Sequence, residues 1–176
     1  MVSNQGLSDP AFEHDSCGIG FVANIKSIKS HEIISDALTV LENMEHRGAC
    51  GCEKDTGDGA GIMLQVPHEF FVDECARLGI SLPPFGKYGV GVLFFPKDIR
   101  LKEECREIFK RCAERVGLEV LGYRKVPVDS TQVGYSALSV APEIEQVFIG
   151  CPDHLLKPDA LERKLFLLRN HASHTI

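Results

Sequence analysis

The chain has 176 residues, 44% of them hydrophobic, which suffices to bury one good core in a single domain or in part of one. Its 19 basic and 25 acidic residues give a net charge of −6, so neither nucleic acid nor an anionic membrane is expected as a partner. No apolar run has the length of a membrane span, the first residues lack the apolar stretch of a secretory signal, and the seven cysteines lack the dense spacing of a disulfide scaffold. These features predict a cytoplasmic protein.

The first part of the chain predicts a polar leader, a strand and a helix, in that order. Residues 1–16 are polar and show no apolar period, so we expect an unpacked leader. Residues 18–25 form a short apolar run of β-prone side chains, which favours a first strand. After Ser30, apolar residues recur at helical spacing as far as Met44, and this pattern predicts a helix that ends before Gly48.

The middle of the chain predicts a glycine-rich loop, two strands and two helices. The loop covers residues 48–61 and leads into a second strand at residues 62–66. A short helix follows over residues 67–78, because proline favours its first turn and a glycine comes directly after it. A buried strand is predicted at residues 90–95, and a charged helix with one apolar stripe at residues 98–116.

The last part of the chain predicts two further strands and a final helix. The strands cover residues 118–128 and 145–149, while residues 142–146 are ambiguous and residues 160–171 are helical. Helices therefore alternate with strands and are long enough to cover the faces of a sheet. The class is α/β or α+β, and the pattern alone does not choose between them.

A cysteine early in the chain is the strongest candidate for chemistry. Cys17 stands in the run E-H-D-S-C-G-I-G-F-V-A of residues 13–23, where glycines leave the backbone open beside a thiol at the mouth of a strand. A thiolate is a strong nucleophile, but near neutral pH a thiol needs a base to take its proton and form it. If residues 1–16 were removed, the α-amino group of Cys17, with an unperturbed pKa of about 7.7–8.0, could be that base, whereas His14 would be lost. A lone cysteine is more often a small buried residue.

Two further motifs follow, H-R-G-A at residues 46–49 and D-T-G-D-G-A-G-I at residues 55–62. Arg47 can brace a loop or hydrogen-bond a carboxylate, and Gly48 permits a close approach of the backbone. From the residues alone, the pair is better explained as the end of a helix, and both roles are compatible. The glycine-rich motif lacks the lysine of a phosphate-binding loop and the terminal glutamate of a calcium-binding loop. It therefore favours a sharp turn that delivers a strand beside Cys17.

These blocks, in this order and at this separation, resemble the start of the class II glutamine amidotransferase domain of the glutamate synthase large subunit. The resemblance implies an α+β, N-terminal-nucleophile hydrolase fold, a four-layer αββα sandwich of which this chain holds the N-terminal part. It also implies a leader at residues 1–16 and an amidotransferase domain at residues 17–176. By this resemblance Cys17 is the catalytic nucleophile, and Arg47 and Gly48 shape the substrate pocket.

The resemblance further implies that L-glutamine is hydrolysed to glutamate and ammonia, which the full enzyme uses to make glutamate from 2-oxoglutarate. No cofactor and no metal are expected in this segment. FMN, an iron–sulfur cluster and NAD(P)H or ferredoxin are implied for the full-length enzyme. The implied partners are the remaining synthase domains and a small reductase subunit.

Some features favour other interpretations. The family's oxyanion donor is an Asn-Gly pair, yet none of the four asparagines precedes glycine, so we expect a truncated chain that is inactive alone; the alternative is a non-catalytic binding module of the same fold. A third hypothesis is a redox or metal protein using Cys50 and Cys52, although zinc would need a second close pair of ligands. Cys105 and Cys112 lie at helical spacing and are expected in the core. His68 and His154 are expected to be hydrogen-bonded or solvent-facing rather than catalytic.

Overall fold

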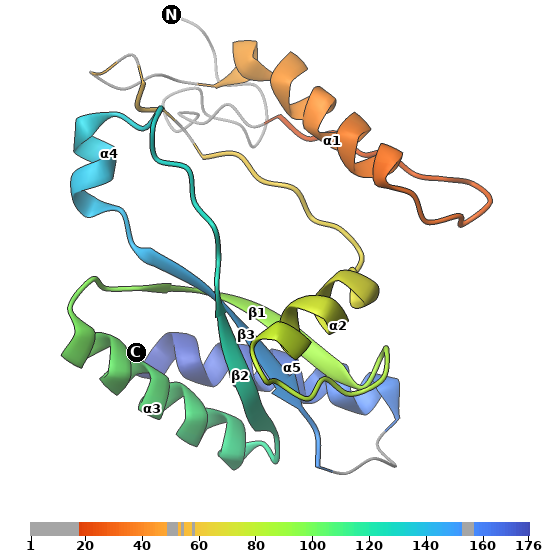
Figure 1. The fold of residues 1–176 in the computed structure, drawn as a ribbon, viewed down its shortest axis with the longest axis vertical. Coiled ribbons are helices and arrows are strands. Elements are labelled where there is room, and N and C mark those ends of the chain that lie inside the picture. The colour runs from red at the N-terminus through yellow and green to blue at the C-terminus, as the bar shows by residue number, and fades with distance from the viewer. Residues whose placement is uncertain (1–17, 49–52, 54, 58, 153–156) are drawn as a thin grey trace, which may run out of the picture. The chain divides into compact units, whose positions relative to one another are not determined.

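The computed structural model describes residues 18–48, 53, 55–57, 59–152 and 157–176 (Figure 1). The predicted leader, Cys17, Cys50, Cys52 and His154 lie outside these residues. The chain divides into a smaller unit, Met1–Leu64 with Ser130–Ser139, and a larger unit, Gln65–Asp129 with Val140–Ile176. Each unit is described by itself.

The larger unit is built on a three-stranded antiparallel sheet in the order β1-β3-β2. The strands are β1 (Tyr88–Phe95), β2 (Glu119–Lys125) and β3 (Glu143–Gly150). β3 lies in the centre and pairs with β1 along its whole length, whereas a bulge interrupts its pairing with β2. Three predicted strands are confirmed, and the ambiguous segment at residues 142–146 belongs to β3 from Glu143 onward.

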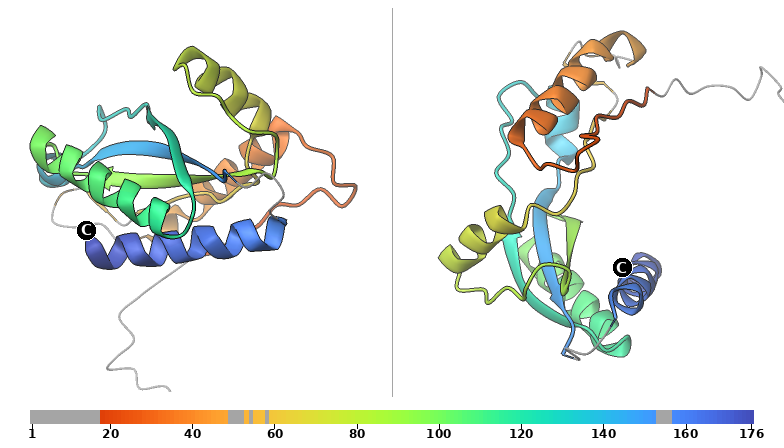
Figure 2. Two further views of the ribbon diagram at one scale, coloured as in Figure 1. Left: turned by 90° about the horizontal axis from the view of Figure 1, so that it is seen from below. Right: turned by 90° about the vertical axis from the view of Figure 1, so that its right-hand side faces the viewer.

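Two long helices cover one face of this sheet. α3 (Ile99–Arg115) and α5 (Pro158–Thr175) lie side by side beneath the strands in the left view of Figure 2. α3 begins where predicted because the Asp98 carboxylate accepts hydrogen bonds from the backbone N–H groups of Arg100 and Leu101. It ends before Gly117, whose φ of 68° suits glycine.

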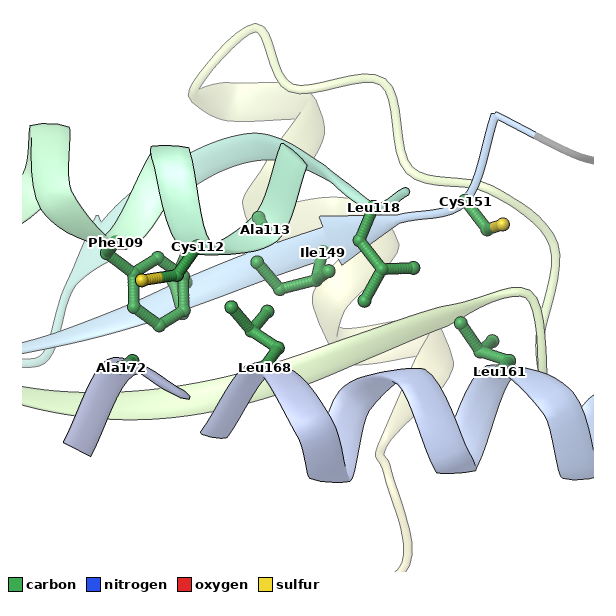
Figure 3. Close-up of a cluster of buried hydrophobic side chains, with 10 residues drawn as sticks. Phe109, Cys112, Ala113, Leu118, Ile149, Cys151, Leu161, Leu168 and Ala172 are labelled. Carbon is green, nitrogen blue, oxygen red and sulfur yellow. The ribbon is translucent and has the colours of Figure 1, made fainter. Parts of the chain in front are cut away.

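A hydrophobic core fills the space between these helices and the sheet (Figure 3). Side chains of α3 and α5 meet Ile149 of β3 and Leu118 in the close-up. Its buried members are Phe109, Cys112, Ala113, Leu118, Val147, Ile149, Cys151, Leu161, Leu168 and Ala172. The apolar stripe predicted for α3 therefore faces the sheet, as does one face of α5.

A second, smaller core lies on the opposite face of the sheet. α2 (His68–Arg77) presents Phe71 and Cys75 to Tyr88 and Phe148, and the Phe71 and Phe148 rings meet edge to face at 5.2 Å. The helix has the predicted bounds to within a residue, and Gly79 follows it with a φ of 70°. Phe148 is fully buried, so β3 supplies side chains to both cores.

A buried carboxylate connects α3 to the centre of the sheet. Glu145 is only 3% exposed, and its oxygens lie 2.7 Å from Nζ of Lys102 and 2.5 Å from Nη2 of Arg106. Burial by itself would raise the pKa of Glu145, but the hydrogen bonds from Arg106 and Lys102 outweigh it and hold the pKa below its ordinary value. The carboxylate is therefore ionised in the folded protein at neutral pH.

We expect Glu145→Gln to lower the free energy of unfolding by about 2 kcal/mol at pH 7, because two cations lose their shared anion. Since the folded-state pKa lies below the unfolded value of about 4.3, the contribution of Glu145 is full above that value and is lost as the pH falls through the folded-state pKa. Urea denaturation between pH 3 and pH 7 should therefore show a flatter profile for Glu145→Gln. The exposed Glu114→Gln on α3 is the control, and equal profiles for both variants would contradict the prediction.

The smaller unit contains α1 (His31–Asn43), a short 3-10 helix (Glu45–Arg47) and α4 (Tyr135–Val140), whose last residue counts with the larger unit. The helix predicted after Ser30 is confirmed, and α4 was not predicted. The strands predicted at residues 18–25 and 62–66 are wrong, because both segments are irregular in the structure. A strand needs a neighbouring strand to satisfy the hydrogen bonds of its backbone. Among the described residues, neither segment pairs with a strand.

Among the described residues, no helix is both long and apolar enough to cross a membrane.

Candidate functional site

The segment that follows Cys17 is held against α1 through a glycine. A Cβ atom added to Gly20 would lie only 2.4 Å from Cγ1 of Val40, so the backbone at residue 20 touches the helix directly. In the turn that follows, the side chain of Asn24 accepts a hydrogen bond from the backbone N–H of Lys26. The glycines after Cys17 were predicted to leave open space, but at Gly20 that space is filled by Val40.

The Arg47-Gly48 pair follows α1 by way of the 3-10 helix. Gly48 donates its N–H to the carbonyl of Glu45 at 3.0 Å and has an extended backbone, with φ −82° and ψ 154°. Glycine is therefore not needed here for a left-handed conformation, and Gly48 ends the 3-10 helix rather than α1, which stops at Asn43. Arg47 is the last residue of the 3-10 helix, and its side chain lies outside the described part of the structure.

The glycine-rich loop contacts a distant segment of the smaller unit. The carboxylate of Glu53 accepts hydrogen bonds from Oγ of Ser136 at 2.7 Å, from the N–H of Ser136 at 3.1 Å and from Oγ1 of Thr56 at 2.9 Å. The N–H of Gly134 donates to the carbonyl of Asp55 at 3.0 Å. We call these contacts the Glu53–Ser136 contact. Sequence reasoning missed it, because no local signal links positions 83 residues apart.

Four cysteines lie in the described part, and none is disposed as a nucleophile. Cys75, Cys112 and Cys151 are buried and Cys105 is half-buried, and all four are free thiols. Burial raises the pKa of Cys75, which lowers its thiolate fraction at neutral pH. The prediction of a core position is confirmed for Cys112, whereas Cys105 is half-buried and belongs to neither core. The role assigned to Cys17 stays a prediction.

His68 is a satisfied histidine, as predicted. Its Nδ1 lies 3.0 Å from the phenolic oxygen of Tyr88, and its ring also meets the edge of Phe85. Within the described residues, no three His, Cys, Asp or Glu side chains come together in a way that could hold a metal ion.

Comparison with known proteins decides the family. The sequence model for class II glutamine amidotransferases matches residues 17–176. The chain belongs to the class II glutamine amidotransferase family. The match of this amidotransferase chain begins at Cys17, the residue that the sequence motif singled out.

The relatives of this amidotransferase chain are glutamate synthases. Glutamate synthase [NADH] of Schizosaccharomyces pombe is 41% identical over 98% of the chain, and the glutamate synthase [NADPH] large chain of Bacillus subtilis is 40% identical over 99%. Ferredoxin-dependent glutamate synthase 2 of Arabidopsis thaliana is 39% identical over 93%. The amidotransferase chain spans 8%, 11% and 10% of the length of these three relatives.

Proposed function

We propose that this chain is the glutaminase part of a glutamate synthase, with L-glutamine as substrate and Cys17 as the nucleophile. The observation that carries the proposal is the family match that begins at residue 17, together with relatives that are all named glutamate synthases. Residues 1–16 are the leader in this proposal, and its removal frees the α-amino group of Cys17 to act as the base.

The reaction proceeds in two steps. The α-amino group takes the thiol proton, the thiolate of Cys17 attacks the amide carbon of glutamine, and ammonia leaves with that proton to give a thioester. Water then hydrolyses the thioester, releases glutamate and restores the thiol. Arg47 holds a carboxylate of the substrate, for which a planar guanidinium is well suited, and Gly48 allows the substrate to approach the backbone.

We assign the domain the four-layer αββα fold of the N-terminal-nucleophile hydrolases. The antiparallel sheet of the larger unit supports this assignment, because helices pack on both of its faces.

The ammonia feeds glutamate synthesis from 2-oxoglutarate in the proposed enzyme, which is cytoplasmic and contains the remaining synthase domains and a small reductase subunit. NADH, NADPH or ferredoxin, which the relatives' names mention, supplies the electrons through FMN and an iron–sulfur cluster. The described residues of this chain bring together no ligand set for such a cluster.

The test combines N-terminal mass determination with covalent labelling of the purified synthase by 6-diazo-5-oxo-L-norleucine, a glutamine-like electrophile. We expect a mature chain that begins at Cys17 and carries one label there, while buried thiols such as Cys75 and Cys112 stay unmodified. An active enzyme with an intact Met1 would exclude the amine-base mechanism. Unlabelled Cys17 would favour a non-catalytic binding module instead.

A further inference from the structure

One edge of the three-stranded sheet is open and unprotected. Among the described residues, β1 pairs with β3 along its whole length, and its other edge has no strand partner. The run Y-G-V-G-V-L-F-F of β1 contains no charged residue and no proline, and its register with β3 is continuous. A long, regular and uncharged edge of this kind is a template on which a further strand pairs, and proteins that leave an edge in solvent usually protect it.

β2, at the opposite edge of the sheet, shows such protection. It carries Glu119, Arg124 and Lys125, and a bulge between Val120 and Gly122 interrupts its regular ladder with β3. Charged side chains and bulges both discourage pairing with another strand. The two edges therefore differ, because β2 has the features that end a sheet and β1 lacks them.

Apolar side chains on the outer part of β1 are uncovered as well. Val92 is 52% exposed and Phe94 is 67% exposed, and both lie on the face of the sheet that carries Val90 and the second core. α2 packs over Tyr88 and Phe148 and so covers the other end of β1 on this face. A strand beside β1 would bring cross-strand side chains against Val92 and Phe94.

The connections between the strands indicate which segment fits the open edge. β1 and β2 both run antiparallel to β3, so they are parallel to one another, and α3 joins them with β3 between them. This arrangement is a split β-α-β unit. α5 follows β3 on the face that α3 also covers, and it lies against β1, because a Cβ atom added to Gly89 would lie 2.6 Å from Cδ1 of Leu165.

The handedness of the crossovers selects one position for a strand that follows α5. Such a strand, parallel to β3, can lie outside β1 or outside β2. Outside β1, its crossover through α5 is related to the β1-α3-β2 crossover by a two-fold axis normal to the sheet, so both have the same hand. Outside β2, the two hands would be opposite. Because crossovers of this type have one hand in nearly all proteins, the position outside β1 is favoured.

We propose that the open edge of β1 binds a strand of the synthase polypeptide that follows α5 in sequence and runs antiparallel to β1. The inference rests on the proposed function in one respect, that this chain is part of a longer synthase. The relatives are long enough to hold such a segment, because the chain spans 8%, 11% and 10% of their length. The side chains of this strand that face Val92 and Phe94 are apolar.

Amide hydrogen exchange of the complete synthase, measured by mass spectrometry on peptides from β1 and β2, tests the proposal. In a strand paired on one edge, about half of the N–H groups point away from the partner and exchange fast, whereas a strand paired on both edges protects nearly all of them. We expect protection of nearly all amides in β1 and of about half in β2, which is the internal control. Protection of only half of the amides in β1 would overturn the proposal.

Truncation and dilution identify the strand that pairs with β1. In a polypeptide that stops after residue 176, about half of the β1 amides should exchange fast, while β3, which is paired on both edges, stays protected and shows that the sheet is folded. Full protection of β1 after truncation would assign the edge to another segment. Loss of β1 protection on hundredfold dilution of the complete synthase would assign it to a second copy. Either result would overturn the proposal.

A substitution in the complete synthase gives a second test that does not depend on folding of the truncated chain. Phe94→Asp places a charge where the added strand packs, so the exchange of β1 should accelerate. Phe166→Asp, at an exposed position of α5, is the control and should leave it unchanged. Equal exchange of β1 in both variants would contradict the proposal. Glutamine does not enter these measurements, so a synthase that uses ammonium but not glutamine would refute the proposed function and leave their result standing.

Discussion

Replacing Cys17 with alanine is expected to abolish the glutamine-dependent rate of the proposed synthase while its ammonium-dependent rate stays largely intact. The thiol serves only the cleavage of the amide, so added ammonium bypasses the step that the variant loses. Cys17→Ser should also be nearly inactive with glutamine, because a hydroxyl is far less ionised than a thiol at neutral pH. Steady-state assays with glutamine and ammonium as alternative donors measure both rates in one preparation.

The other cysteines of the smaller unit supply the control for this prediction. Cys50→Ser and Cys52→Ser should lose little glutamine-dependent activity if the thiols of the loop are incidental. Full glutamine-dependent activity in Cys17→Ala would refute both the nucleophile and the mechanism proposed with it. Loss of both donor-dependent rates would instead show that Cys17 is needed for the fold.

The largest effect on stability is expected from Phe148→Ala. The side chain of Phe148 is 0% exposed in the central strand and packs edge to face on Phe71 of α2. Its removal leaves a cavity between the sheet and α2, which should lower the free energy of unfolding by about 3–5 kcal/mol. Chemical denaturation followed by circular dichroism measures this loss as a lower midpoint.

Phe166 on α5 provides a matched control for the same truncation. Its side chain is 62% exposed, so Phe166→Ala should change the free energy of unfolding by less than about 0.5 kcal/mol. A similar loss of unfolding free energy in both variants would mean that no buried core lies between the sheet and α2.

The helices could be predicted because the signals that start and end them are local. Asp98 caps α3 from one residue before it, and Gly79 and Gly117 take up left-handed backbones just after α2 and α3. The amphipathic pattern then placed Phe109 and Cys112 toward the core. α4 escaped prediction because its six residues are too few to show a helical period.

The strands and the contacts of the site depend on partner segments that cannot be identified from the local sequence. Residues 90–95 became part of β1 because β3 pairs with them, whereas residues 18–25 have equally β-prone side chains and stay irregular. The motifs around Cys17 and Arg47 identified the family, but nothing near Glu53 pointed to Ser136. A pairing across such a distance can be seen only once the chain has folded.

The strand order of the larger unit has a consequence for how the protein is made. β3 is the last strand of this sheet to leave the ribosome, yet it lies between the two strands made before it. β1 and β2 pair only with β3 in this sheet, so neither finds its partner until residue 150 has emerged. Such non-local pairing slows folding, and the apolar strands β1 and β2 stay open to wrong partners for that interval. Translation pauses before β3 should therefore favour aggregation of the nascent chain.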